Sequence, residues 1–156
     1  MNPEKPRGNQ HDAGKVGDDM HGSFLQETLK EKGVETKGLL LDPDFFTTLA
    51  FVELTGSGER IFSFARKPGA DTQLKSDELP FDILRDTKIF HFGSLSLTHE
   101  PARTATLTAI SAAKDAGAII PYDPNYRSRL WESKEEASLR LMDRGRYIRT
   151  FQHPGS

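Results

Sequence analysis

Four side chains able to bind an anion or a hydroxyl group stand close together after an apolar run of the sequence. The stretch YDPNYRSR follows directly on AGAII and supplies a carboxylate, an amide and two guanidinium groups, from Asp123, Asn125, Arg127 and Arg129. A guanidinium presents a planar fork of donors that matches phosphate oxygens, and a carboxylate accepts a hydrogen bond from a hydroxyl or a metal-bound water. The segment therefore indicates a site for an anionic ligand. The alternative is a plain strand exit, in which Asp123 caps the strand and water solvates the arginines.

The elements around this stretch are predicted to be a strand, a helix and a second strand. Residues 88–97 (KIFHFGSLSL) form the first strand and residues 118–123 (AIIPYD) the second. Between them a helix runs to residue 116, with Thr98 as its cap and Pro101 in its first turn, where a missing N–H costs little. Such a unit makes two parallel strands, and open parallel sheets bind ligands beyond the carboxyl ends of their strands. Gly93 and Asp123 stand at such ends.

A helix is predicted upstream, over residues 20–32. Asp18 or Asp19 caps it, because a short carboxylate accepts the free N–H groups of the first turn, and Gly33 stops it. The glycines of GKVGDDMHG, which precede and enter this helix, match neither the GxxxxGK[ST] phosphate loop nor the GxGxxG dinucleotide pattern. They favour a tight turn into the helix, with the acidic pair solvated.

The segment TTLAFVELTGSGERIFSFAR predicts a β-hairpin. Apolar residues alternate on either side of Gly56-Ser57-Gly58, and both faces of the hairpin carry apolar side chains. Two strands alone are marginal in water, so this hairpin is expected to cover something on each face. A loop and a short helix follow, with Asp77 as the expected cap.

Composition excludes several classes of function. The chain has 156 residues and a formal net charge of -2, so its charge offers no case for nucleic acid as a partner. It has no cysteine, which excludes disulfides and thiol chemistry and fits a reducing compartment. Its five histidines show no metal-ligand spacing, and no run is long and apolar enough to cross a membrane. We expect a cytoplasmic protein, with a plastid location only if an N-terminal extension is missing.

Taken in order, five stretches resemble the middle of a fructokinase, a sugar kinase of the ribokinase-like (pfkB) carbohydrate kinase family. They are GKVGDDMHG, the hairpin, KPGADTQL, IFHFGSLSL and SAAKDAGAIIPYDPNYRSRLW. The resemblance covers residues 14–139 and implies a partial carbohydrate kinase domain with an α/β fold. That fold is a partial three-layer ribokinase-like architecture, a parallel sheet plus a β-hairpin from the lid over the sugar site, about residues 47–66. Residues 1–13 are expected to be a disordered tail and residues 140–156 an atypical C-terminal tail.

The resemblance also implies roles for single residues on the sugar side. Arg66 matches a lid arginine that reaches the sugar in some family members. Phe64 stands where some relatives have tyrosine, so a hydroxyl contact is expected to be missing. Gly93 would line the sugar pocket, with room for the ligand because glycine has no side chain.

The stretch after the last predicted strand is similar to the family's DxNxR segment. Asp123 and Asn125 would then lie near the sugar, and Arg127 would act in catalysis by stabilising charge on the transferred phosphoryl group. The base that takes the hydroxyl proton is an Asp in a GAGD motif in the family, and these 156 residues contain no GAGD. The family's upstream Gly-Gly and Asn sugar motif and its Asn and Glu pair for magnesium are not found either.

The resemblance predicts the function of the family, but it leaves open whether this chain performs that function. The family function is ATP-dependent phosphorylation of a sugar, fructose to fructose 6-phosphate, with ATP and magnesium as cofactors of the complete enzyme. The chain alone is expected to be inactive, to bind both cofactors poorly and to hold no metal. Three alternatives stay open: a non-catalytic pseudoenzyme or module that pairs with a full-length kinase or a second copy through the lid hairpin, a truncated gene model without a function, and a kinase for another sugar such as 2-keto-3-deoxygluconate.

Overall fold

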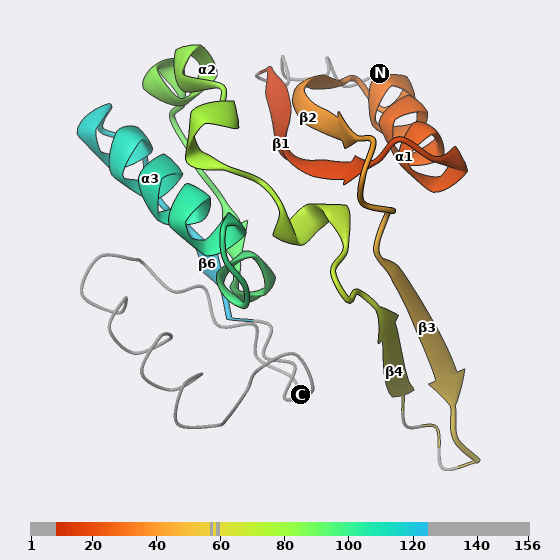
Figure 1. Ribbon diagram of the computed structural model, residues 1–156. Helices are drawn as coiled ribbons and strands as arrows, with labels where there is room; N and C mark the ends of the chain where they lie inside the picture. Colours follow the sequence, from red (N-terminus) through yellow and green to blue (C-terminus); the bar gives the residue numbers. More distant parts are fainter. Residues whose placement is uncertain (1–8, 57, 59, 125–156) are drawn as a thin grey trace, which may run out of the picture. The chain divides into compact units, whose positions relative to one another are not determined.

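The computed structural model describes residues 9–56, 58 and 60–124 (Figure 1). The chain divides into two compact units, unit 1 (Met1–Gln73) and unit 2 (Leu74–Ser156), whereas the sequence predicts one partial domain over residues 14–139. The predictions for residues 1–8 and for everything after residue 124 lie outside the described part. Within that part, no helix has both the length and the apolar character that a membrane span requires.

Unit 1 begins with a parallel strand–helix–strand unit. β1 (Gln10–Gly17) pairs with β2 (Val34–Asp42), and α1 (Met20–Glu31) connects them. Because Gly17 lies opposite Asp42, the carboxyl ends of both strands lie at one edge of the sheet. The sequence analysis predicts neither strand. It also assigns residues 10–13 to a disordered tail, which is wrong, because they form the first half of β1.

The helix predicted over residues 20–32 is confirmed as α1. Asp19 is its N-cap and accepts a hydrogen bond from the N–H of Gly22 at 2.8 Å. Gly33, with a φ of 76°, provides the left-handed residue that ends the helix. The predicted tight turn is also present. Gly22 packs so closely on Gly17 that a Cβ at Gly22 would overlap the carbonyl oxygen of Gly17.

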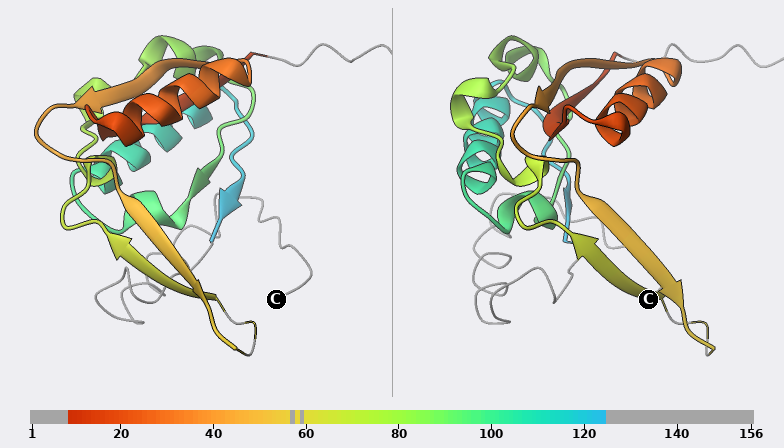
Figure 2. Two further views of the ribbon diagram at one scale, coloured as in Figure 1. Left: turned by 90° about the vertical axis from the view of Figure 1, so that its right-hand side faces the viewer. Right: turned by 45° about the vertical axis from the view of Figure 1, so that its right-hand side comes forward.

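The predicted hairpin is confirmed as β3 (Leu49–Leu54) and β4 (Arg60–Ala65), an extended antiparallel ribbon (Figure 2). Residues directly opposite one another in such a pair point to the same face. One face therefore carries Ala50, Val52, Leu54, Phe62 and Phe64, and the other carries Leu49, Phe51, Ile61 and Ala65. Both faces are apolar, as predicted.

Unit 2 contains the predicted strand–helix–strand unit. β5 (Phe92–Gly93) and β6 (Tyr122–Asp123) are parallel, and α3 (Ala102–Asp115) connects them. The helix packs on the strands through a buried cluster of Phe92, Leu97, Ala113, Ile120 and Tyr122. A second cluster joins α3 to α2 (Phe81–Asp86) and the 3-10 helix η2 (Ser76–Glu78); its buried members are Leu79, Leu84, Ala105 and Ala109. These contacts fix the strand ends of unit 2 in place.

The strand predicted over residues 88–97 is confirmed only at β5 and at an isolated parallel bridge between Ile89 and Ile119, and it is wrong in its second half. Residues 94–97 form a 3-10 helix, η3 (Ser94–Leu97), directly after β5. The Ser96 hydroxyl donates to the carbonyl of Gly93 at 3.0 Å, and the Thr98 hydroxyl donates to the carbonyl of Leu95 at 2.8 Å. Such local hydroxyl bonds offer the backbone an alternative to a strand ladder.

Two predicted helix caps are also wrong. The N-cap of α3 is Pro101 rather than Thr98, and the carboxylate of Glu100 accepts the N–H of Thr104 at 3.1 Å. Asp77 lies inside η2, and α2 begins after Pro80 without a side-chain cap. In both cases the helix starts four residues later than the hydroxyl or carboxylate chosen from the sequence.

Substituting Gly22 tests the close contact between α1 and β1. A Cβ at residue 22 would overlap backbone of Gly17, which cannot give way as a flexible side chain does. We expect Gly22→Ala to lower the free energy of unfolding by about 2 kcal/mol, because the overlap outweighs the gain in helix propensity of about 1 kcal/mol. Urea unfolding followed by circular dichroism measures the change. Ser23→Ala, at an exposed neighbour on the same helix, is the control, and equal stability of the two variants would contradict the contact.

Candidate functional site

The strand ends of unit 2 bring two of the predicted site residues side by side. Gly93 pairs with Asp123 in parallel register, and Asp123 is exposed. Among the described atoms, a Cβ at Gly93 would meet the Asp123 carbonyl oxygen at 3.8 Å, which is an ordinary contact. Packing therefore does not require a glycine here, and the position leaves room beside the strand ends. Asn125 and Arg127 lie outside the described residues, so their roles stay predictions.

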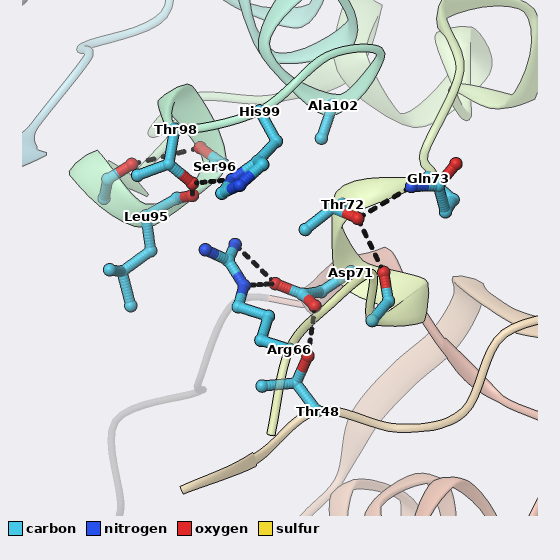
Figure 3. Close-up of polar contacts among 12 residues, drawn as sticks. Thr48, Arg66, Asp71, Thr72, Gln73, Leu95, Ser96, Thr98, His99 and Ala102 are labelled. Atoms are coloured by element: carbon cyan, nitrogen blue, oxygen red, sulfur yellow. Dashed lines mark hydrogen bonds and ion pairs between the residues drawn. The ribbon is translucent and has the colours of Figure 1, made fainter. Parts of the chain in front are cut away.

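In unit 1, a carboxylate that sequence reasoning missed holds Arg66. Arg66 directly follows β4, and 7% of its surface is exposed. Its Nε and Nη2 both donate to Oδ2 of Asp71, at 2.7 and 2.6 Å (Figure 3). Asp71 lies in η1 (Ala70–Thr72), a 3-10 turn after the hairpin. The buried guanidinium is thus paired with an opposite charge, as a buried charge must be to offset its lost hydration.

The other oxygen of Asp71 binds the opposite strand of the hairpin. Thr48, just before β3, donates its hydroxyl to Oδ1 of Asp71 at 2.5 Å (Figure 3). A Cβ at Gly69 would overlap the Thr48 side chain and crowd Asp71, so glycine leaves the space in which these groups meet. One carboxylate therefore joins both ends of the hairpin. In the sequence, the acidic residue of KPGADTQL was the available signal, but no spacing rule links it to Thr48.

Phe64 supplies an apolar surface on the hairpin. It lies opposite Ala50 in the strand pair and stacks on Phe62, with ring centroids 6.2 Å apart. Both rings are partly buried. A phenyl ring offers no hydrogen bond, so any polar recognition at this end of β4 falls to Arg66.

A second carboxylate, Asp19, anchors the start of the hairpin. Its Oδ2 accepts the backbone N–H of Thr47 at 2.7 Å, and its Oδ1 accepts the Thr47 hydroxyl at 2.8 Å. The same hydroxyl oxygen accepts the N–H of Gly17 at 3.0 Å. The Thr47 backbone bond, together with N–H groups of the first turn of α1, lowers the pKa of Asp19 to about 2. The sequence predicts the helix cap but not the long-range bond to Thr47.

A buried ion pair joins β1 to the carboxyl end of β2. Lys15 Nζ lies 3.4 Å from Oδ2 of Asp42, and it donates to the carbonyl of Gln73 at 3.3 Å. Burial raises the pKa of Asp42, but hydrogen bonds from the N–H groups of Asp44 and Phe45, together with Lys15, outweigh burial and leave the pKa below its usual value. The pair thus ties the end of β2 to the segment that follows η1.

The chain belongs to the family of pfkB carbohydrate kinases, whose family model matches residues 8–148. The α/β fold is accordingly the partial ribokinase-like fold that the sequence predicts. The family that the five short stretches resemble is therefore confirmed.

Three relatives show where in that family the similarity lies. The chain is 50% identical to probable fructokinase-4 of Arabidopsis thaliana over 129 residues, which are 83% of this chain and 40% of that protein. The crystal structure of fructokinase from Xylella fastidiosa has a TM-score of 0.80 and 37% identity, over 86% of this chain and 41% of that one. Fructokinase from Vibrio cholerae O395, solved with fructose, ADP and a calcium ion, has a TM-score of 0.76 and 33% identity, over 87% and 44% of the two chains. The chain thus spans less than half the length of these relatives.

Removing the Asp19 carboxylate tests the anchor. We expect Asp19→Ala to lower the free energy of unfolding by about 2 kcal/mol at neutral pH, the upper range for loss of a helix cap. The folded pKa, about 2, lies below the ordinary 3.8, so the carboxylate stabilises the fold above about pH 4 and its contribution disappears as the pH falls toward 2. The difference in stability between wild type and variant should shrink over that interval. Urea unfolding at a series of pH values measures it.

The neighbouring carboxylate provides the matched control. Asp18 is exposed, and we expect Asp18→Ala to change the free energy of unfolding by less than about 0.5 kcal/mol. A loss in Asp19→Ala that stays constant from neutral pH down to about pH 2 would contradict the anchor, because the carboxylate would then contribute nothing through its charge.

Proposed function

We propose that this chain forms the sugar-binding part of a kinase that phosphorylates fructose to fructose 6-phosphate with ATP. The observation that carries the proposal is the buried guanidinium of Arg66, held by Asp71 at the base of the hairpin. An arginine fixed in this way can donate to the hydroxyl oxygens of a sugar without first being ordered. The relatives support fructose as the substrate, since the Vibrio cholerae enzyme was solved with fructose and ADP.

The remaining roles follow the family resemblance and the strand ends of unit 2. We assign Gly93 to the sugar pocket, where its missing side chain leaves room, and Asp123 to a hydrogen bond from a sugar hydroxyl. Asn125 is proposed as a further sugar contact. Arg127 is proposed to stabilise the charge that spreads over the transferred phosphoryl group, which would favour the transition state over the bound substrate.

ATP and a divalent cation are the cofactors proposed for the complete enzyme. A structure of the Xylella fastidiosa fructokinase contains bound ATP. Among residues 9–56, 58 and 60–124, no group of three or more His, Cys, Asp or Glu side chains is arranged to hold a metal ion. The described residues therefore do not fit a magnesium site.

The 156 residues alone are proposed to bind sugar without transferring phosphate. Nucleophilic attack by a sugar hydroxyl needs a base that takes its proton, and the GAGD motif that carries this base in the family does not occur in the chain. We propose the cytoplasm as the compartment of the enzyme. The sugar assignment has one alternative, 2-keto-3-deoxygluconate, which the resemblance leaves open.

Calorimetric titration of the 156-residue chain with fructose tests the proposal. We expect saturable binding that weakens about tenfold or more in Arg66→Ala, because hydrogen bonds from a charged donor are lost. Arg60→Ala is the matched control, since Arg60 is an exposed arginine on the same strand. A coupled assay with ATP should detect no fructose 6-phosphate from this chain.

A different experimental result would contradict each part of the proposal. Equal loss in the two arginine variants would remove Arg66 from the site. Tighter binding of 2-keto-3-deoxygluconate than of fructose would change the sugar. Phosphorylation by the chain alone would show that a base other than the GAGD aspartate acts in it.

The hairpin favours a second candidate function, a module that pairs with a full-length kinase or with another copy of this chain. Large apolar side chains are exposed on both of its faces: Phe51 at 59%, Val52 at 53% and Leu54 at 69%. Exposed apolar side chains of this size are a common feature of protein–protein contacts. This observation supports pairing through the hairpin.

A charge placed on the hairpin tests the pairing. We expect light scattering to find an oligomer in the wild-type chain and a monomer in Val52→Asp, because burying an unpaired carboxylate in an apolar contact is costly. Ser23→Asp adds the same charge at an exposed position on α1 and should leave the oligomer intact. A monomeric wild-type chain at all concentrations would contradict self-pairing.

A further inference from the structure

The carboxylate of Asp71 links the two ends of the hairpin, Thr48 before β3 and Arg66 after β4. One of its oxygens accepts two N–H groups of Arg66, which follows β4, and the other accepts the hydroxyl of Thr48, which precedes β3 (Figure 3). Both oxygens are therefore engaged, each with a different end of the same hairpin.

We propose that Asp71 is a positioning residue, which fixes the guanidinium of Arg66 in the orientation that binds the sugar. The inference rests on the proposed function, in which Arg66 contacts the substrate. Asp71 itself would act through Arg66.

The geometry of the ion pair supports this role. Asp71 contacts the guanidinium along one edge, where its Oδ2 lies 2.7 Å from Nε and 2.6 Å from Nη2, so two nitrogens of the group are held by one oxygen. An arginine side chain has many rotamers, and ordering it only when the ligand arrives would weaken binding. Burial of Arg66 restricts it further, since 5% of its side chain is exposed.

Asp71 is held in its turn by the surrounding backbone. Asp71 lies in η1, which begins five residues after the end of β4, and the Thr72 hydroxyl donates to the carbonyl of Gly69 in this turn at 2.7 Å. The bond from Thr48 fixes the second carboxylate oxygen. The carboxylate therefore has a defined direction before it meets Arg66, which a surface ion pair between two mobile side chains lacks.

Three variants of the 156-residue chain separate positioning from mere support of the fold. Asp71→Asn keeps the shape and removes the charge, and Asp71→Ala removes both. Asp18→Asn removes the charge of an exposed carboxylate in the same unit and is the matched control. Two readouts are taken on each: the fructose dissociation constant by calorimetry, and the Arg66 Nε–H signal in the NMR spectrum of the 15N-labelled chain, assigned by its loss in Arg66→Lys.

We expect the Arg66 Nε–H of the wild-type chain to give a slowly exchanging signal, which Asp71→Asn shifts and Asp71→Ala abolishes. The fructose dissociation constant should rise about tenfold in Asp71→Asn, within the range of coupling between contacting residues. In the Arg66→Ala background, Asp71→Asn should have no further effect. Asp18→Asn should keep both the signal and the affinity within about twofold.

Three results would overturn the inference: an unchanged Arg66 signal in Asp71→Ala, additive effects of the Asp71 and Arg66 substitutions, or equal loss of affinity in Asp18→Asn. The proposed function fails separately, if the wild-type chain does not bind fructose. In that case the NMR signal alone decides whether Asp71 fixes Arg66.

Discussion

The carboxylate of Asp19 joins three segments of unit 1 that are separate in the sequence. It caps the start of α1, binds both the N–H and the hydroxyl of Thr47 at the start of the hairpin, and through that hydroxyl meets the N–H of Gly17 at the end of β1. Each of these groups would otherwise be a buried or partly buried donor without an acceptor, and such groups are costly. The start of the hairpin is therefore fixed relative to α1 and the end of β1.

Asp71 repeats this arrangement on the other side of the hairpin base. Asp19 fixes Thr47, and Asp71 fixes both Thr48 and Arg66, so two short carboxylates determine where the hairpin starts and ends. Neither bond depends on the tip of the hairpin. The base of the hairpin is therefore held by polar groups, whereas its two strands carry apolar side chains on both faces.

The sequence predicted the elements that local chemistry determines. The helix over residues 20–32 has its cap and its glycine stop, and the hairpin has strict alternation around Gly56-Ser57-Gly58, so both were found. β1 and β2 were missed because QHDAGKVG and VETKGLLLD carry little period-two alternation. The two strands are stabilised by pairing with each other and by the buried Lys15–Asp42 ion pair. Such contacts join residues far apart in the sequence, so no residue spacing predicts them.

Some residues of the candidate site could likewise be predicted from local sequence patterns, and others could not. Gly93 and Asp123 were correctly placed at strand ends, because the strand–helix–strand pattern is local and parallel pairing follows from it. Asp71 was missed, because its two partners lie before and after the hairpin and only the fold brings them to one carboxylate. The family resemblance singled out Arg66 but gave no account of what holds a buried guanidinium in place.

Hydrogen exchange at the Thr47 amide tests most directly whether the hairpin base is anchored within this chain. This N–H donates to Asp19 and belongs to a residue that is 4% exposed. In the 15N-labelled wild-type chain at neutral pH, it should exchange as slowly as the amides paired between β1 and β2, since opening it requires the same unit to open. Exchange at the rate of an unprotected amide, while β1 and β2 stay protected, would show that the base of the hairpin is not anchored and would contradict the account.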